Sequence, residues 1–599
     1  MANTKRISMP NQPIIQLLKR LWHHISPRRR GQFTLLLLLM LLASFAEILS
    51  IGAVLPFLGA LTSPERIFSH PLLQPIIKAL GLTFSSQLLL PLTIIFVVAV
   101  IAASIMRLLL LWASTRFTFY TGSDLSMSIY RRTLYQPYSV HCARNSSVVI
   151  NGISNKVSNV IGIINNVLTI ISSALITTVI LIALLSVNPV IALSAFSCFS
   201  LIYVLIIKLN MKRMLSDSER IASESTRVIK ILQEGLGGIR DVLVDGSQEA
   251  YCQIYQSADL NLRRAQGSNL FISGSPRYGM EALGMVLIAI LAYSLVRKTN
   301  GLNAIPILGV FVLGSQRLLP VLQQAYGAWS NVKGYQISLQ DTLELLDQPL
   351  PNFTNQQDIK PLMFMHSIDL RQVDFRYDPQ STYVLKQVNL TIEKGSRVGF
   401  IGTTGSGKST LIDIIMALLQ PVNGSLEIDG RVITLGNQRS WQAHVAHVPQ
   451  AIFLSDSSIE ENIAFGVPKD QIDHHRVRDA AKQAQIADII QSWPEQYQTF
   501  VGERGVRLSG GQRQRIGIAR ALYKKADVII FDEATSALDS ETEEAVMQAI
   551  EGLNESLTVL IIAHRLTTLK NCTKIVELAD GCISRIGSYQ NIVNQRTLN

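Results

Sequence analysis

The first part of the chain alternates long apolar stretches with polar segments. Each apolar stretch holds about twenty residues or more, and a helix of that length covers the roughly 30 Å hydrocarbon core of a bilayer. The pattern therefore predicts six membrane-spanning helices. They cover Thr34–Leu61, Leu88–Ala113, Ile161–Val187, Val190–Ile207, Gly279–Val296 and Ala304–Leu322.

The connections between these stretches predict which ends face the cytoplasm. The second-to-third and fourth-to-fifth connections are long, about 48 and 70 residues, and hold most of the Lys and Arg residues. Because basic residues stay on the cytoplasmic side, we expect both connections there, together with the N-terminus and its basic run at 28–30. The first apolar stretch is too long for a signal-peptide core and should remain as a span.

Beyond a Pro- and Asn-rich linker, the pattern changes to that of an α/β domain. Runs such as Val398–Ile401 and Val528–Phe531 are apolar throughout, as expected for strands of a buried parallel sheet. Helical segments alternate with these runs. The expected division is an N-terminal cytoplasmic or interfacial segment (1–33), an α-helical six-span transmembrane domain (34–345), a linker (346–365) and an α/β domain (366–599).

Composition supports a membrane protein and argues against a soluble one. Apolar residues make up 48% of the chain and charged residues only 16%, where soluble proteins have about a quarter charged. The net charge is +17 over residues 1–340 and −6 over 341–599. Since the basic half is also the apolar half, its charge suits an anionic membrane leaflet, and no nucleic-acid partner is expected. The five cysteines lack CxxC spacing, which argues against zinc sites and disulfides.

A glycine-rich motif predicts a phosphate-binding loop. Residues 402–410 (GTTGSGKST) fit GxxxxGK[ST], follow a strand-like run and open a helix-like one. Backbone amides of such a loop surround nucleotide phosphates, with a lysine ammonium as counter-charge and a serine hydroxyl for Mg²⁺. The predicted ATP-binding residues are Gly402, Thr403, Thr404, Gly405, Ser406, Gly407, Lys408, Ser409 and Thr410, and Ser409 is also a predicted Mg²⁺ ligand.

Two adjacent carboxylates supply what hydrolysis of ATP requires. Asp532 and Glu533 follow an apolar strand-like run about 120 residues after the P-loop. Asp532 is expected to hold Mg²⁺, while Glu533 is placed to polarise an attacking water. The pair alone is a weak signal, but with the P-loop it becomes a strong one.

Three further motifs identify a family. LSGGQ (508–512) precedes a basic helix-like run, SALD (536–539) follows Glu533, and His564 follows a strand-like run. The set resembles the ATPase domain of ABC transporters, and LSGGQ is its specific element. The resemblance implies an α/β P-loop ABC ATPase fold. It also implies ATP contacts by Tyr377, Ser509, Gly510, Gly511, Gln512 and Asp539, a catalytic and Mg²⁺-binding role for Gln450, and a catalytic role for His564.

In this family, the signature of one subunit covers ATP bound at the P-loop of another. One ATPase domain with six spans therefore predicts a homodimer that uses ATP and Mg²⁺. Spans fused ahead of the ATPase resemble the exporter architecture. The expected location is the bacterial inner membrane, in a multi-pass protein whose ATPase domain is cytoplasmic.

Ionisable residues within apolar stretches are candidates for substrate binding, because burial costs free energy unless they are paired or hydrated. The candidates are Glu47, Arg277, Glu281 and Arg317. Arg277 and Glu281 are four residues apart and could instead pair with each other. Arg107 could extend to a membrane interface.

Segments around these residues, such as FVLGSQRLLP (311–320), resemble bacterial flippases of polyprenyl-pyrophosphate-linked oligosaccharides. Arginines bind phosphates bidentately, which suits a lipid-linked glycan or another amphipathic lipid. The expected function is ATP-driven flipping of such a glycan from the cytoplasmic to the outer leaflet. A multidrug or glycolipid (lipid A) exporter is the alternative, since it would differ only in the cavity. An ATP-gated regulator is disfavoured because Glu533 and His564 are present.

Overall fold

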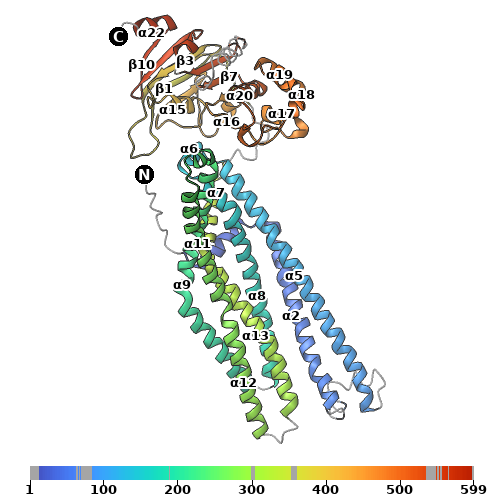
Figure 1. Ribbon diagram of the computed structural model, residues 1–599. Coiled ribbons are helices and arrows are strands. Elements are labelled where there is room, and N and C mark those ends of the chain that lie inside the picture. The colour runs from blue at the N-terminus through green and yellow to red at the C-terminus, as the bar shows by residue number, and fades with distance from the viewer. Residues whose placement is uncertain are drawn as a thin grey trace. The chain divides into compact units, whose positions relative to one another are not determined.

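The computed structural model describes residues 12–62, 65, 68, 84–187, 189–298, 304–351, 361–533, 548, 552, 556–563 and 565–596. The chain forms two compact units (Figure 1). The first comprises Met1–Gln136 and Arg144–Pro349, and the second comprises Pro137–Ala143 and Leu350–Asn599. The second unit thus includes the short helix α6 (Tyr138–Ala143), which the sequence placed within the transmembrane domain.

The first unit is helical, and its long helices run lengthwise beside one another (Figure 1). The 46 residues of α5 rise about 70 Å, more than twice the hydrocarbon thickness, so this helix continues beyond a membrane. The elements are α1 (Ile14–His24), α2 (Pro27–Thr62), η1 (Ser85–Leu88), α5 (Leu89–Leu134), α7 (Ser146–Asn151), the π-helical turn η2 (Gly152–Lys156), α8 (Val157–Val187), α9 (Pro189–Gly237), α10 (Ile239–Val244), α11 (Gln248–Gly274), α12 (Pro276–Lys298), α13 (Ala304–Gly334) and α14 (Gln336–Leu346).

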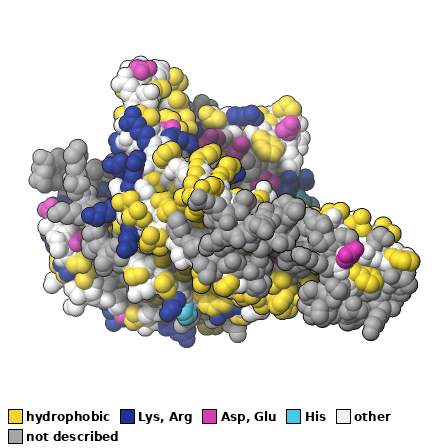
Figure 2. Space-filling model, turned by 90° about the horizontal axis from the view of Figure 1, so that it is seen from below, with side chains coloured by type: hydrophobic (Ala, Val, Ile, Leu, Met, Phe, Trp, Pro, Cys, Tyr) yellow, Lys and Arg dark blue, Asp and Glu magenta, His cyan; other side chains and the backbone are white. Residues whose placement is uncertain are grey.

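Three stretches of the described helices are long and apolar enough to cross a membrane: Pro27–Val54, Leu89–Leu134 and Ser146–Ile182. The other three expected spans lie on α9, α12 and α13. Many large apolar side chains of α2, α5, α9 and α12 are exposed, as suits contact with lipid. Seen from below the view of Figure 1, hydrophobic side chains cover much of the described surface, and Lys and Arg side chains gather beside them (Figure 2).

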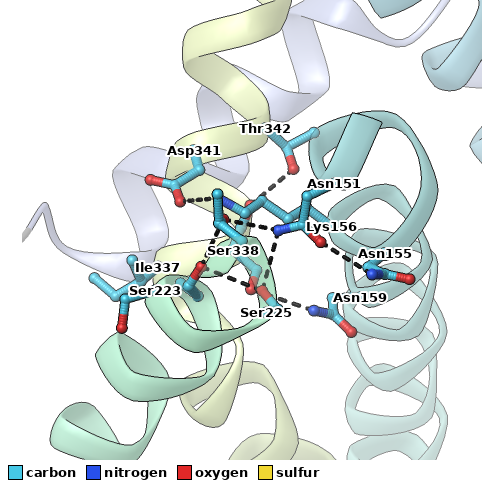
Figure 3. A network of polar contacts seen from close by, with 12 residues as sticks. Asn151, Asn155, Lys156, Asn159, Ser223, Ser225, Ile337, Ser338, Asp341 and Thr342 are labelled. Carbon is cyan, nitrogen blue, oxygen red and sulfur yellow. Dashed lines mark hydrogen bonds and ion pairs between the residues drawn. The ribbon is translucent and has the colours of Figure 1, made fainter. Parts of the chain in front are cut away.

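A buried polar network ties three parts of the first unit together (Figure 3). The Lys156 ammonium pairs with the Asp341 carboxylate, and the Lys156 side chain is only 3% exposed. Asn151 Nδ2 donates to Ser225 Oγ at 3.1 Å, which joins α7 to α9. Asn159 Nδ2 donates to the hydroxyl of a serine on α14 at 3.2 Å. Burial of so many polar groups is tolerated because they satisfy one another.

The second unit contains two sheets. The strands β1 (Ser367–Phe375), β2 (Leu385–Glu393), β4 (Asn423–Ile428) and β5 (Arg431–Val432) form an antiparallel sheet in the order β2-β1-β4-β5. The larger sheet has the order β10-β9-β3-β8-β7-β6 and is parallel except at β10. Its strands are β3 (Arg397–Gly402), β6 (Val445–Val448), β7 (Val528–Asp532), β8 (Thr558–Ile562), β9 (Lys574–Ala579) and β10 (Cys582–Gly587).

Helices surround this sheet (Figure 1), and its central strands β3, β7 and β8 are apolar because both of their faces are covered. Phe400 of β3 and Phe531 of β7 are fully buried. The helices are α15 (Lys408–Ile415), α16 (Gln438–Gln442), α17 (Ile459–Ile463), α18 (His474–Gln483), α19 (Ala487–Ser492), α20 (Gly510–Lys524) and α22 (Tyr589–Arg596), with 3-10 turns η5 (Lys469–Gln471), η6 (Gln496–Gln498), η7 (Glu503–Gly505) and η8 (Leu566–Leu569).

Candidate ATP site and membrane cavity

Four neighbouring parallel strands end at the same edge of the large sheet. β3 pairs with β8, β8 with β7, and β7 with β6, all in parallel register. The P-loop follows β3, Asp532 ends β7, and Gln450 follows β6 by two residues. The sheet topology therefore places these predicted residues along one edge, where open α/β sheets bind ligands.

The P-loop conformation requires glycine at its two ends. Gly402, Gly405 and Gly407 have φ values of +149°, +86° and +97°, which other residues rarely adopt. A Cβ at Gly402 would lie 2.3 Å from the carbonyl oxygen of Leu578, and one at Gly407 would lie 3.0 Å from that of Val384. The loop can therefore curve into a backbone cradle only with these glycines.

The side chains of the loop suit an anion. Lys408 opens α15 and is buried, and its Nζ donates to the carbonyl oxygens of Gly402 (2.8 Å) and Thr403 (3.0 Å). Burial lowers the pKa of Lys408. The nearby carboxylates of Glu533 and Asp532 raise this pKa and so offset part of the decrease. The Oγ atom of Ser406 is buried without a hydrogen-bond partner. A lysine held on backbone oxygens and an unsatisfied hydroxyl both fit phosphate oxygens.

The carboxylates lie next to Gln450. Gln450 Nε2 donates to Glu533 Oε2 at 2.7 Å, so the residues after β6 and β7 meet. Glu533 has a φ of +49°, and its backbone N–H donates to the carbonyl oxygen of Ile562 at 3.1 Å. This bond to the end of β8 fixes a non-glycine residue in the left-handed region, a strain found often at functional sites.

A second acid lies close to this edge. Burial raises the pKa of Asp413 on α15 to about 6, and the charge of Asp532 adds to the effect. The negative charge of Asp532 thus raises the pKa of both Asp413 and the P-loop lysine, Lys408. The predicted Mg²⁺ ligand Ser409 is exposed on the first turn of α15.

Tyr377 lies against the start of α15. Its hydroxyl is 3.0 Å from Thr410 Oγ1, and its ring packs edge-on against Phe375 with centroids 5.0 Å apart. The ring is 56% exposed. An exposed aromatic face beside the P-loop is available for stacking on a base.

The signature forms the N-terminus of α20. Ser509 Oγ accepts from the Gln512 backbone N–H at 3.2 Å, and Gln512 Oε1 accepts from the Ser509 N–H at 2.9 Å. This reciprocal capping box fixes the start of a 15-residue helix. Ser509 and Gly510 are exposed, and Gly511 is buried. The helix therefore presents its first residues outward.

Three predicted site residues lie wholly or partly outside the part of the chain that the structure describes. His564 and Asp539 lie outside it entirely. Arg317 lies on α13, but its side chain is not described. Ile562, the last residue of β8, ends beside Asp532 in the sheet register.

Glu47 has a partner that the sequence did not reveal. Its side chain is only 4% exposed and pairs with the guanidinium of Arg107, whose side chain is 52% exposed. The two residues come from α2 and α5, 60 positions apart. Both are ionisable groups inside predicted spans, and this shared property was the only signal of the pairing.

The Glu47–Arg107 pair lines a cavity of about 460 Å³ within the first unit. One helical face of α8 contributes uncharged polar groups, and α13 contributes two amides. The polar lining residues besides the pair are Ser114, Asn165, Thr169, Ser172, Ser173, Gln316 and Gln324. The volume is typical of small-ligand sites, and the lining combines one ion pair with hydroxyls, amides and apolar side chains.

Arg277 and Glu281 pair with each other. Arg277 Nε donates to Glu281 Oε1 at 2.8 Å, and the side chains are 63% and 41% exposed. This is the intrahelical pairing that their spacing allows. Arg277 also lines a smaller cavity of about 260 Å³ with Tyr203 and Gln323. Arg277 does not line the Glu47–Arg107 cavity, but the two cavities share Pro320 and Gln324 in their linings.

Comparison with known proteins agrees with this architecture. Residues 32–318 match the ABC transporter transmembrane region, and residues 385–536 match the ABC transporter family. An ATP-dependent lipid A-core flippase of Saccharophagus degradans is 31% identical over 480 residues, covering 79% of this chain and 80% of the relative. The chain therefore belongs to the ABC transporter family.

Two further comparisons cover more of the chain. The heterocyst differentiation ATP-binding protein HepA of Nostoc sp. is 29% identical over 571 residues, covering 93% of this chain and 90% of that protein. The structure of a bacterial Atm1-family ABC exporter with ATP bound has a TM-score of 0.77 at 23% identity and covers 95% of this chain and 96% of its own. The predicted fold is confirmed: a helical transmembrane domain precedes an α/β ABC ATPase domain.

The protein is thus an ATP-driven ABC exporter of the half-transporter type, embedded in the membrane by several helices. Predicted ATP binding and hydrolysis by the ABC domain are supported by the family match. The narrower resemblance to oligosaccharide flippases is not shared by these relatives, among which lipid A-core flippases recur.

Proposed function

We propose that the exporter works as a homodimer that moves a phosphate-bearing glycolipid of the lipid A-core type across the bacterial inner membrane. The main support is the Glu47–Arg107 pair in a cavity whose other polar lining groups are hydroxyls and amides, beside apolar side chains such as Leu110 and Ile176. Arginine binds phosphate bidentately, while hydroxyls and amides suit sugar hydroxyls. The likeness to lipid A-core flippases supports this class of lipid.

The ATP site supports coupling of transport to hydrolysis. Glu533 would polarise the attacking water, and Gln450 orients the Glu533 carboxylate through its amide. Ser409, Asp532 and Gln450 are the residues that would hold Mg²⁺, which when bound neutralises phosphate charge. Lys408 and the Ser406 hydroxyl would bind phosphate oxygens.

A homodimer follows from the position of the signature. Ser509 and Gly510 are exposed at the N-terminus of α20, where a helix end attracts an anion. We propose that they cover the γ-phosphate of ATP held at the partner's P-loop. Asp539 and His564 are assigned to the same site by family resemblance only. We also propose that the ATPase domain lies on the cytoplasmic side of the membrane, as the basic connections between the spans predict.

A polyprenyl-pyrophosphate-linked oligosaccharide is the second candidate substrate. It shares phosphate and sugar chemistry with lipid A-core glycolipids, and the segment at 311–320 favours it. Arg277, Glu281 and Arg317 remain proposed contacts for such a substrate. A multidrug exporter receives less support, because the relatives that recur are lipid A-core flippases.

Substrate-stimulated ATPase activity tests this proposal. The purified full chain in nanodiscs should respond to a lipid A-core glycolipid, with the response expressed relative to the basal rate of each variant. Arg107→Ala should lose the stimulation, while Arg220→Ala, an exposed arginine on α9, should keep it. The polyprenyl-pyrophosphate-linked oligosaccharide is tested in parallel. Stimulation by a hydrophobic cationic drug, but by neither this lipid nor the lipid A-core glycolipid, would overturn the proposal.

A further inference from the structure

A second cavity, of about 750 Å³, lies between α2 and α5, which run side by side in Figure 1. One end is basic and carries Arg28, Arg29 and Arg116. The other end is apolar, with exposed leucines such as Leu35 and Leu38 on α2. The groove shares no lining residue with the Glu47–Arg107 cavity. It is therefore a separate feature of the membrane unit.

The basic end has more positive charge than its acid can balance. Arg29 pairs with Asp124, with Nε and Oδ2 2.8 Å apart, and its side chain is 16% exposed. Arg116 lies over the Trp112 ring at 4.9 Å from its centroid. Arg28 is exposed on the first turn of α2. Arg28 and Arg116 are thus available to bind an anion, whereas Arg29 is held by its ion pair with Asp124.

The aromatic residues at this end suit a membrane interface. Trp112 and Tyr120 are 59% and 49% exposed and lie one on each side of Arg116 along α5. Arg29 and Arg116 both lie over the Tyr120 ring, at 5.1 and 5.9 Å from its centroid. Trp and Tyr gather at the level of lipid headgroups, where one end of the ring is apolar and the other wet.

The apolar end fits within a single leaflet. Leu35, Leu38 and Leu42 are 68%, 53% and 49% exposed. From the first to the last of them α2 rises about 10 Å, which is less than the roughly 15 Å of one hydrocarbon leaflet. An acyl chain lying along these leucines would place its phosphate beside Arg28.

We propose that this groove binds an anionic phospholipid of the cytoplasmic leaflet. The phosphate contacts Arg28 and Arg116, and one acyl chain packs along Leu35, Leu38 and Leu42. Charge complementarity selects an anionic lipid over a zwitterionic one, because the ammonium group of a zwitterionic headgroup would be repelled by the arginines. The bound lipid holds the cytoplasmic ends of α2 and α5 together. This site does not depend on the proposed transport substrate.

Native mass spectrometry of the full chain in detergent tests the site, with phosphatidylglycerol and phosphatidylcholine as probes. Wild-type protein should bind phosphatidylglycerol about tenfold more tightly than the double variant Arg28→Ala/Arg116→Ala. The matched control Arg220→Ala/Arg264→Ala removes the same charge from exposed positions on α9 and α11 and should bind as wild type does. Equal affinity in all three proteins, or equal affinity for both lipids, would overturn the proposal.

Fluorescence quenching locates the bound lipid. Phosphatidylglycerol with brominated acyl chains should quench part of the tryptophan emission, and Trp112→Phe should remove that part. Water-soluble glycerol 3-phosphate should not displace the lipid, because it lacks the acyl chain. Displacement by glycerol 3-phosphate, or quenching that is unchanged in Trp112→Phe, would contradict the assignment.

Discussion

The two units of the chain position their polar residues in different ways. In the ATPase unit the P-loop, Asp532 and Gln450 follow strands of one parallel sheet, and strand register brings them to one edge. In the membrane unit Glu47 and Arg107 come from two helices, and the packing of these helices brings them together in a cavity. Sequence motifs therefore predict the residues of the first site, whereas the residues of the second site are known only once the helices are packed.

This difference predicts different tolerance to substitution. The ATP site depends on backbone conformations, as at Gly402 and Glu533, that few residues can adopt. The cavity depends on one ion pair surrounded by uncharged groups that can rearrange. We therefore expect changes in the ATP site to abolish turnover whatever the substrate, and changes in the cavity to alter which substrate stimulates it.

The largest expected effect is on hydrolysis. Glu533→Gln should lower ATP turnover by about 10²–10⁴-fold while ATP still binds, because a positioned base is lost. Steady-state phosphate release and binding of labelled ATP measure the two properties. Glu495→Gln, an exposed acid of the same unit, should turn over normally. Near-normal turnover in Glu533→Gln would remove this residue from the catalytic role.

Mixing chains tests whether the ATP site is shared between subunits. Lys408→Ala and Ser509→Arg chains should each fail to close an ATP site alone. Random mixing should restore about a quarter of the sites, because half of the dimers are mixed and each has one intact pair of motifs. Occlusion of labelled ATP measures this. A complete lack of recovery in dimers shown to be mixed would contradict a shared site.

The polar network of the first unit should matter for stability. Lys156→Met removes the cation that pairs with the partly buried Asp341 carboxylate and should cost up to about 3–5 kcal/mol. Lys156→Met/Asp341→Leu should lose less, since both charges of the pair are removed. Thermal unfolding of the full chain in detergent compares them, with Lys212→Met on an exposed face of α9 as control. An unchanged melting temperature for Lys156→Met would show that the pair does not support the fold.

A smaller effect concerns pH. Because the pKa of Asp413 is raised to about 6, its protonated form stabilises the fold. That stabilisation is complete below the usual aspartate pKa near 4 and is lost as the pH rises through about 6. Asp413→Asn should remove this loss, on the order of 1–2 kcal/mol. Melting curves between pH 4 and 8 should therefore be flatter for the variant; parallel curves would contradict the assignment.

The sequence was sufficient for the parts of the site that depend on local pattern. The glycine spacing and flanking strand predicted the P-loop at 402–410, and apolar runs predicted β3 and β7. The contact between Gln450 and Glu533 could be expected only by family resemblance, because it joins residues 83 positions apart through sheet order.

Pairings within the membrane unit could not be predicted in the same way. The spacing of Arg277 and Glu281 allowed a local pair, since four residues place two side chains on one helix face. Glu47 and Arg107 have no such spacing, and which faces of α2 and α5 meet depends on the packing of all the helices. The π-helical turn at Gly152–Lys156 also has no pattern of its own.

Translocation in proteoliposomes tests the central claim most directly. The full chain is reconstituted with a fluorescent lipid A-core glycolipid, and a membrane-impermeant quencher reports how much lipid changes leaflet after ATP is added. We predict ATP-dependent movement in wild type and Arg220→Ala, and its loss in Glu533→Gln and Arg107→Ala. Movement at the wild-type rate in Arg107→Ala, or none in wild type, would contradict the proposed substrate and its cavity.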